Sequence, residues 1–212
     1  MIVELREDTL WFPDTAIADE DGLLAYGGDL SAERLLLAYR QGIFPWYSEE
    51  SPILWYSPHE RFVLLPNEIR ITKSMKQILQ SGKFEMRKNT AFAEVIRCCA
   101  IAERAGQEGT WITNEMQDAY IVLHQKGIAH SYETWFQNEL VGGLYGVEIG
   151  NVFCGESMFS KASNASKAAL VWLAQNFNYD LIDCQVYTEH LESMGAKMIS
   201  REEYEVYLQI TP

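Results

Sequence analysis

Hydrophobic positions follow a helical period in the first half of the chain and a strand period after Ala129. Before that residue, apolar side chains recur at every third or fourth position in four segments, which predicts amphipathic helices. The helices are expected over residues 31–41, 72–80, 91–104 and 114–126. Ser31 is expected to cap the first of them and Asn114 the last. Short apolar runs at 61–65 and 84–88 predict strands on either side of the second helix, so a mixed α/β protein is expected.

The alternating period after Ala129 predicts a meander of three strands and then a further group of elements. The strands and their tight turns are expected at residues 129–136, 139–150 and 151–159, with turns at Gln137-Asn138 and Gly150-Asn151. The later elements are expected to be a helix opening at Ser163-Asn164, a strand at 181–185, a short helix from Thr188, a strand at 196–200 and a helix capped by Ser200.

Glycine thins the middle strand of this meander at Gly142, Gly143 and Gly146. Glycines inside a strand are typical of a bulge or of a place where a ligand approaches the backbone closely. Close packing of a crossing helix explains the same residues equally well. The sequence leaves both interpretations open.

Three polar residues, Glu156, Asp183 and Gln185, lie on strands that are otherwise apolar. Because strand side chains alternate, Asp183 and Gln185 are expected to project from one face of their strand. Ile182 and Cys184 are expected to project from the other face. A carboxylate in an apolar setting costs free energy unless it is paired or used in chemistry. These residues are therefore expected to line a functional pocket.

The length of 212 residues allows one large core, or one domain with a smaller one. We expect a small N-terminal α/β domain at residues 1–60 and a larger domain at 61–212. Apolar residues make up 48% of the chain, which argues against disorder. No apolar run approaches the roughly 20 residues that span a bilayer, and the acidic first residues are unlike a signal peptide. A cytoplasmic protein with no membrane partner is therefore expected.

Cysteines and histidines lack the spacing of a metal site. The cysteines are Cys98, Cys99, Cys154 and Cys184, and none forms a CxxC pair. Reduced thiols in the core are therefore expected, rather than a zinc or redox site. The four histidines are scattered along the chain. No metal is expected.

The net charge of −13 argues against a protein that coats nucleic acid without specificity. Residues 61–90 depart from this balance, because they carry seven basic and two acidic side chains, a net charge of +5. Such a basic segment is typical of a surface that contacts phosphates. A solvated helix face is the competing interpretation.

The order of elements from residue 129 onward is the order found in the C-terminal half of GNAT-like acyltransferases. This likeness suggests acyl transfer to an amine, although fold alone is a weak guide to function. The Q/R-x-x-G-x-G/A loop that holds the pyrophosphate of coenzyme A in such enzymes is missing, and the nearest segment, SKASNASK, has no glycine. The acyl donor is therefore expected not to be an acyl-CoA, and a CoA-dependent N-acetyltransferase is kept as the alternative.

Nine blocks of sequence resemble leucyl/phenylalanyl-tRNA–protein transferases over nearly the whole chain. They are DGLLAYGGDLSAERLLLAYRQGIFPWYS, PILWYSP, GTWIT, AHSYETW, LVGGLYGV, FCGESMFS, NASKAAL, LIDCQV and HLESMGA. The resemblance implies an aminoacyltransferase that moves leucine or phenylalanine from aminoacyl-tRNA to the N-terminal Arg or Lys of an acceptor protein. The product would be marked for degradation by the bacterial N-degron pathway. A relative that binds aminoacyl-tRNA without catalysis is the second alternative.

The resemblance also assigns binding residues, position by position. The 3′-terminal adenosine of the tRNA would be held by Trp46 and Trp111. The pocket for the leucyl or phenylalanyl side chain would be lined by Leu144, Met158, Leu170, Leu173 and Ile182. The acceptor-stem phosphates would contact Arg70, Lys73, Lys76 and Lys83. We expect the chain to act as a monomer, and transfer of methionine is left open.

Catalytic roles follow from the same resemblance and from the three polar strand residues. Asp183 with Gln185 is expected to activate or orient the attacking amine, and this role is favoured over the competing interpretation of Asp183 as a buried carboxylate that caps backbone amides. Glu156 is expected to bind the cationic acceptor terminus or the free amino group of the donor. The donor ester is already activated, so neither ATP nor another cofactor is needed. Because an α-amino group has a pKa of about 7.7–8.0, a modest base is sufficient, and that base is a protein group or the adenosine 2′-hydroxyl.

Overall fold

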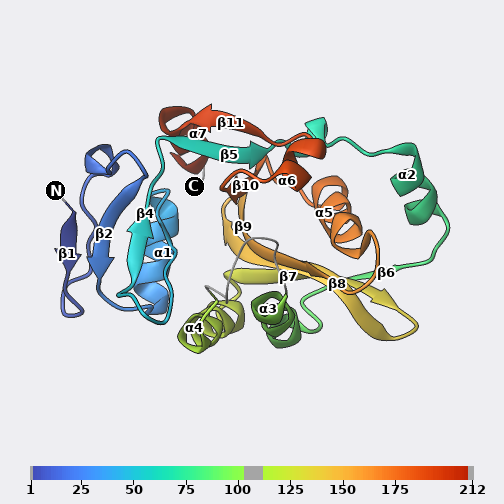
Figure 1. The fold of residues 1–212 in the computed structure, drawn as a ribbon, viewed down its shortest axis with the longest axis horizontal. Coiled ribbons are helices and arrows are strands. Elements are labelled where there is room, and N and C mark those ends of the chain that lie inside the picture. The colour runs from blue at the N-terminus through green and yellow to red at the C-terminus, as the bar shows by residue number, and fades with distance from the viewer. Residues whose placement is uncertain (1, 103–111, 210–212) are drawn as a thin grey trace.

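Two β-sheets organise the computed structural model, which describes residues 2–102 and 112–209 (Figure 1). The smaller sheet has the strand order β1 (Val3–Leu5), β2 (Leu23–Gly27), β4 (Leu54–Tyr56) and β3 (Phe44–Pro45). The larger sheet has the order β11 (Lys197–Ser200), β5 (Glu60–Leu64), β10 (Leu181–Gln185), β9 (Val152–Ser160), β8 (Glu139–Ile149), β7 (Ala129–Phe136) and β6 (Glu85–Lys88). The mixed α/β class expected from the sequence is confirmed.

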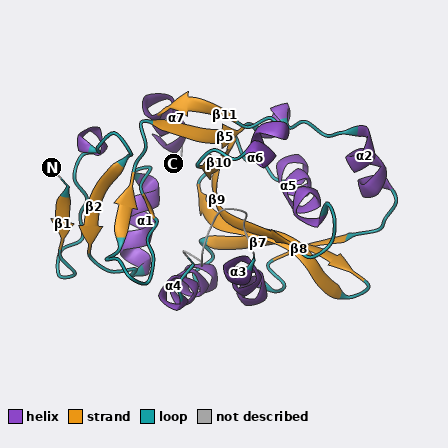
Figure 2. Ribbon diagram, viewed as in Figure 1, coloured by secondary structure: helices purple, strands orange, loops and turns teal. Residues whose placement is uncertain are grey.

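Helices cover both faces of the larger sheet (Figure 2). The helices are α1 (Ala32–Arg40), α2 (Lys73–Gln80), α3 (Phe92–Ile101), α4 (Asn114–Gln125), α5 (Ala165–Asn176), α6 (Glu189–Ser193) and α7 (Arg201–Gln209), with 3₁₀ turns at Thr15–Ile17 and Pro66–Glu68. Helix α5 packs on one face of β7 and β8, and α3 and α4 pack on the other (Figure 1). None of the described helices is long and apolar enough to cross a bilayer.

Strands β9 and β10 are the point at which the larger sheet changes direction. The meander β7–β8–β9 is antiparallel, but β10 runs parallel to β9 and antiparallel to β5. A parallel neighbour requires a crossover, and α5 supplies it. The β9–β10 pairing covers three residue pairs, ending at Asp183 opposite Cys154, while β9 continues to Ser160. Beyond this pairing the two strands are free to diverge and leave room for a cavity.

The expected helix boundaries agree with the structure to within a few residues, with one corrected cap. The hydroxyl of Ser31 accepts a hydrogen bond from the Arg34 amide, as an N-cap does. The cap of α4 is Thr113, whose hydroxyl accepts from the Met116 amide, and not Asn114. Thr113 has the extended backbone that an N-cap requires, whereas Asn114 is already the first helical residue.

The glycines of β8 make room for neighbouring parts of the same chain. A Cβ atom on Gly142 would lie 2.5 Å from the Ala165 Cβ, so α5 crosses the strand in direct contact with its backbone. The strand pairing also shifts register between Tyr145 and Gly146, which is the bulge expected from the sequence. Helix packing and a bulge therefore account for the glycines without a ligand.

The small sheet was not expected in detail from the sequence. Its strands are two to five residues long, and the turn residues between them interrupt any periodic pattern. The core is continuous across the two sheets, since Leu24 and Trp55 of the small sheet belong to the same buried cluster as Val63 of the larger one. The division of the chain at residue 60 stays a prediction.

Candidate functional site

A cavity of about 510 Å³ lies where β9 and β10 diverge. Strand β3 and helices α5 and α6 complete its walls. Its lining residues are Phe44, Pro45, Trp46, Leu144, Phe153, Gly155, Glu156, Ser157, Met158, Leu170, Ile182, Asp183, Cys184, Gln185, Val186, Thr188, His190 and Leu191. The volume and the mainly apolar wall are typical of a site for a small organic group.

Most of the expected side-chain pocket lies in this wall. Leu144, Met158, Leu170 and Ile182 line the cavity, as expected. Leu173 is fully buried in the core on α5 and is not among the lining residues. Leu170 and Leu173 lie on the same face of α5 and in the same buried cluster, but only Leu170 reaches the cavity.

The two tryptophans expected to bind adenosine have different outcomes. Trp46 lines the cavity and is 42% exposed, with its ring 5.8 Å from that of Tyr56. A large ring that is exposed at a cavity wall is available for stacking on a planar group. Trp111 lies outside the described residues.

Glu156 is buried at the cavity wall and accepts three hydrogen bonds. Its Oε1 accepts from the Tyr39 hydroxyl at 2.6 Å and from Gln185 Nε2 at 2.7 Å, and its Oε2 accepts from the Tyr120 hydroxyl at 3.2 Å. Burial raises the pKa of Glu156 to about 7, and the nearby charge of Asp183 adds to that rise. The three hydrogen bonds oppose it without cancelling it. The carboxyl group is therefore able to gain or lose a proton near neutral pH.

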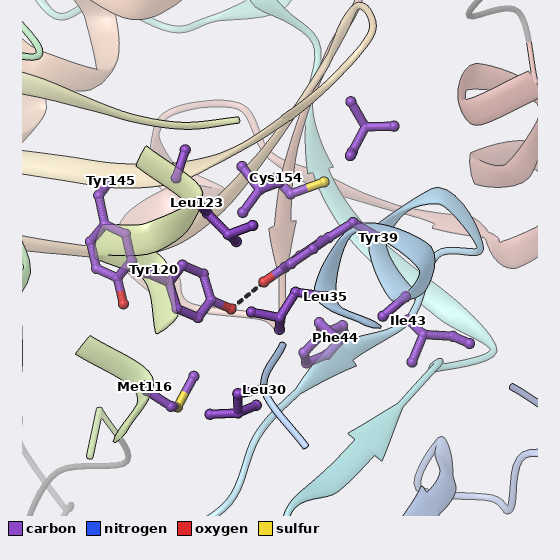
Figure 3. Packing of buried hydrophobic residues seen from close by; sticks show 14 of the residues in the cluster. Leu30, Leu35, Tyr39, Ile43, Phe44, Met116, Tyr120, Leu123, Tyr145 and Cys154 are labelled. Atoms are coloured by element: carbon purple, nitrogen blue, oxygen red, sulfur yellow. Dashed lines mark hydrogen bonds between the residues drawn. The ribbon is translucent and has the colours of Figure 1, made fainter. Parts of the chain in front are cut away.

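Two tyrosines that were not singled out in the sequence hold Glu156. Tyr39 comes from α1 and Tyr120 from α4, and their hydroxyls also contact each other, so their two protons are shared among this contact and the two contacts with Glu156 (Figure 3). Burial, and then the charge of Glu156, raise the pKa of both hydroxyls well above the ordinary value. Both are therefore neutral donors at pH 7. In the sequence they had the apolar spacing of core residues, which gave no sign of this role.

Asp183 is fully buried in an ion pair with Arg61. Arg61 Nε donates to both carboxylate oxygens at 3.0 Å, and Nη2 donates to Oδ2 at 2.9 Å. The Tyr204 hydroxyl donates to Oδ2 at 3.0 Å, and the Gln185 amide donates to Oδ1 at 2.8 Å. The carboxylate is thus paired by a charge and also caps a backbone amide, which was the structural alternative for this residue.

Strand β10 is irregular at its end. The pairing with β5 shifts register between Asp183 and Gln185, and Gln185 has a φ of 61°. Ile182 and Cys184 nevertheless pack in the cluster that contains Leu170, whereas Asp183 contacts Arg61 and Tyr204 and Gln185 contacts Glu156, so the expected division between two faces is confirmed. A left-handed conformation is uncommon outside glycine, and here it turns the Gln185 side chain toward Glu156.

The basic segment 61–90 divides into buried and exposed charges. Arg61 is buried against Asp183, and Arg87 is hydrogen-bonded to Glu85. The four residues expected to contact phosphates, Arg70, Lys73, Lys76 and Lys83, are exposed on α2 and its flanks. Helix α2 lies at the end of the molecule opposite β1 (Figure 1).

Metal-binding clusters of three or more His, Cys, Asp or Glu residues are absent from residues 2–102 and 112–209. The four cysteines all lie in the described residues and form no disulfide there; three are buried and Cys184 is partly exposed at the cavity. Burial raises the pKa of the Cys154 thiol well above its usual value, and that of Cys184 as well. These thiols are therefore protonated at neutral pH.

Comparisons with known proteins agree over most of the chain. The family model described as leucyl/phenylalanyl-tRNA protein transferase matches residues 63–209, and the model of its N-terminal domain matches residues 28–59. A leucyl/phenylalanyl-tRNA–protein transferase of Syntrophus aciditrophicus is 57% identical over 196 residues, covering 91% of this chain and 82% of that protein. One from Flavobacterium johnsoniae is 56% identical over 198 residues, covering 92% and 93%.

Two solved structures are distantly similar to this chain. A conserved protein of unknown function from Bacteroides thetaiotaomicron is 12% identical, with a TM-score of 0.43 over 71% of this chain and 55% of that chain. The L-PGS of Bacillus licheniformis is 14% identical, with a TM-score of 0.39 over 80% and 57%. Neither score is high enough to support a conclusion about fold.

Proposed function

The chain belongs to the leucyl/phenylalanyl-tRNA–protein transferase family, and from that membership we propose which donor, acceptor and residues its reaction uses. It is an aminoacyltransferase that moves leucine or phenylalanine from aminoacyl-tRNA to a protein. The acceptor is proposed to begin with Arg or Lys, and the product to enter the N-degron pathway of protein degradation. The observation that carries the proposal is an apolar cavity with a buried carboxylate, Glu156, in its wall.

The aminoacyl end of the donor is proposed to fill this cavity. Leu144, Met158, Leu170 and Ile182 would surround the leucyl or phenylalanyl side chain, because burial of these apolar surfaces against each other is favourable. Trp46 would stack on the terminal adenine outside, with Trp111 as the second aromatic partner. The leucyl ester carbonyl would then lie near Glu156 and Gln185.

Glu156 is proposed to be the base of the transfer. The α-amino nitrogen of the acceptor attacks the ester carbonyl carbon, a C–N bond forms, and the bond from that carbon to the ribose oxygen breaks. Glu156 accepts the proton that the nitrogen loses and returns it to the departing ribose oxygen. A carboxylate whose pKa is about 7 suits both halves of this exchange at neutral pH. Asp183 orients Gln185, and takes no proton itself.

The direct test is to incubate the protein with leucyl-tRNA and a peptide that begins with Arg. Mass spectrometry is expected to detect one leucyl residue added at the peptide N-terminus. A peptide of the same sequence that begins with Ala is the control and should remain unmodified. Absence of leucyl addition to the Arg peptide would rule out the proposed function.

Donor preference is expected to depend on Leu144 and not on Leu173. Leu144→Phe narrows the cavity and is expected to lower the ratio of kcat/KM for phenylalanyl-tRNA over leucyl-tRNA about tenfold, the usual scale for a small size difference in an apolar pocket. Leu173→Phe is the matched control, since it adds the same volume to the core and should reduce only stability. An equal change of the ratio in both variants would contradict this assignment.

Binding of the tRNA is proposed to use the exposed charges around α2. Replacing Lys73, Lys76 and Lys83 together by glutamine is expected to reduce the slope of log K against log salt by about 2.7, because each lysine that contacts a duplex phosphate contributes about 0.9 through counterion release. Lys126→Gln, which removes an exposed charge next to α4, is the control. If the triple variant has the same slope as wild type, α2 is only a solvated face.

Several wider assignments remain proposals. The GNAT-like architecture of residues 61–212 is supported by the order of β7–β8–β9, α5, β10, α6 and β11 with β10 parallel to β9. We also propose, from the sequence alone, that the chain divides into domains 1–60 and 61–212. A cytoplasmic location and action as a monomer are proposed from the sequence as well. Size-exclusion chromatography combined with light scattering would test the last of these.

A further inference from the structure

We propose that Arg61 and Tyr204 are positioning residues for the transfer reaction, because together they hold Asp183 in the place where it fixes the active conformation of Gln185. The inference rests on the function proposed above and adds two residues to its machinery. Both residues lie outside the lining of the cavity, and neither was expected to act in the site from the sequence.

Arg61 is held rigidly on all sides. Its guanidinium lies between the rings of Phe44 and Tyr204, with 4.6 Å from its central carbon to each ring centroid. Its Nη1 donates to the Gly42 carbonyl at 3.1 Å, and its other nitrogens donate to Asp183. Arginine is suited to this arrangement because its planar group stacks on aromatic faces and forks onto a carboxylate. The contacts tie β3, β5, β10 and α7 together at one charged group.

The carboxylate of Asp183 has no capacity left for a substrate proton. Its two oxygens accept from Arg61, Tyr204 and the Gln185 amide, and the side chain is fully buried. A carboxylate has about four lone-pair positions, and the hydrogen bonds from these donors occupy them. Asp183 therefore acts through what it holds, and the group that it holds nearest the cavity is the Gln185 amide.

Gln185 requires such support because its backbone is left-handed. A φ of 61° is costly for a residue with a side chain and persists only when neighbouring contacts enforce it. The 2.8 Å hydrogen bond from its amide to Asp183 Oδ1 is such a contact. In this conformation Gln185 Nε2 donates to Glu156, which leaves the amide oxygen as the acceptor group of that side chain. Among the described residues no donor contacts that oxygen, so it is available to the substrate amine.

The chain of contacts therefore runs from Arg61 and Tyr204 through Asp183 to Gln185 and Glu156. Loosening its far end should let Gln185 leave the strained conformation, which would misplace both the amine and Glu156. The aminoacyl side-chain pocket should keep its shape, since its wall is formed by apolar packing and not by this chain of hydrogen bonds. Misplacement of reacting groups lowers kcat, whereas pocket damage raises KM for the donor.

Tyr204→Phe is the decisive variant, because it removes one hydroxyl and keeps the ring over Arg61. We expect kcat for leucyl transfer to an Arg peptide to fall about tenfold, with KM for leucyl-tRNA within about twofold of wild type. Arg61→Lys keeps the charge but loses the fork, and kcat is expected to fall on the order of 100-fold. Tyr132→Phe is the matched control. Tyr132 is fully buried, its hydroxyl oxygen lies 2.7 Å from that of Tyr179 in a hydrogen bond, and it is not among the residues that line the cavity.

The outcomes separate this inference from the proposed function. The inference is supported if wild type transfers leucine, if Tyr132→Phe has wild-type kcat, and if Tyr204→Phe has a lower kcat with an unchanged KM for leucyl-tRNA. If wild type transfers leucine and Tyr204→Phe has wild-type kcat, the inference is overturned and the proposed function stands. Should Arg61→Lys fail to fold, Tyr204→Phe decides alone. If wild type transfers nothing, the proposed function fails first.

Discussion

Glu156→Gln is expected to lower kcat for leucyl transfer by about 10²–10⁴-fold, the range that general base catalysis contributes. The substitution keeps the size and shape of the side chain but removes its ability to take a proton. An amide also retains an oxygen that accepts from Tyr39 or Tyr120, so the surroundings should change little. The measurement is single-turnover transfer from leucyl-tRNA to an Arg peptide at pH 7.5.

Glu148→Gln is the matched control for this experiment. Glu148 also lies on the larger sheet and accepts a hydrogen bond from a tyrosine, Tyr179, at 2.5 Å, but it is not part of the cavity lining. Its replacement should leave kcat at the wild-type value. A Glu156→Gln protein with unchanged kcat would transfer the role of base to the adenosine 2′-hydroxyl. A raised KM for the acceptor at constant kcat would instead mean that Glu156 binds the ammonium group.

The residues of the site were predictable where a polar group interrupts an apolar strand. Glu156, Asp183 and Gln185 stand out in this way, and the structure brings all three together at the cavity. The role of Tyr39 and Tyr120 was not predictable. A tyrosine at an apolar helix position has the same sequence spacing whether or not its hydroxyl hydrogen-bonds to a carboxylate. Their role depends on α1 and α4 meeting β9, which is a tertiary event.

Arg61 shows why charge counts along a sequence mislead. It was counted with the lysines of a basic segment, yet it is buried against Asp183, 122 positions away in the chain. A buried arginine is retained when a carboxylate compensates it, and sequence gives no sign of such long-range pairing. The same limit applies to the irregular end of β10, because the left-handed turn at Gln185 depends on the Asp183 contact and not on local preference.

The fold was predictable where elements are long and periodic. The meander, α5 and β10 were expected at nearly the observed residues, since their patterns extend over five to twelve residues. The small N-terminal sheet escaped because β3 has two residues and β1 and β4 have three. Such strands are stabilised by their partners and by Trp55 and Leu24 in the core, not by a pattern of their own.

Glu156→Gln, which is expected to remove activity, is also expected to make the free energy of unfolding rise relative to wild type as the pH increases. The folded protein holds Glu156 with a pKa of about 7, whereas the ordinary value is 4.5. Between these values the folded state keeps a proton that the unfolded chain has lost, so wild-type stability falls as pH rises through this window. Glutamine does not titrate. The free energy of unfolding of the variant relative to wild type should therefore rise by about 2 kcal/mol between pH 5.5 and 8.

Urea unfolding of both proteins at pH 5.5 and at pH 8 measures this difference. If the free energy of unfolding changes with pH by the same amount in both proteins, the raised pKa of Glu156 is contradicted. Tyr39→Phe tests the direction of this effect, because the Tyr39 hydroxyl lowers the pKa of Glu156. Its loss should raise that pKa, so the pH range over which stability falls should extend to higher pH. The stability result also bears on the activity result. A Glu156→Gln protein that is inactive but more stable than wild type at pH 8 cannot be inactive through misfolding. The free energy that burial costs Glu156 would then be the cost of keeping a base at the cavity.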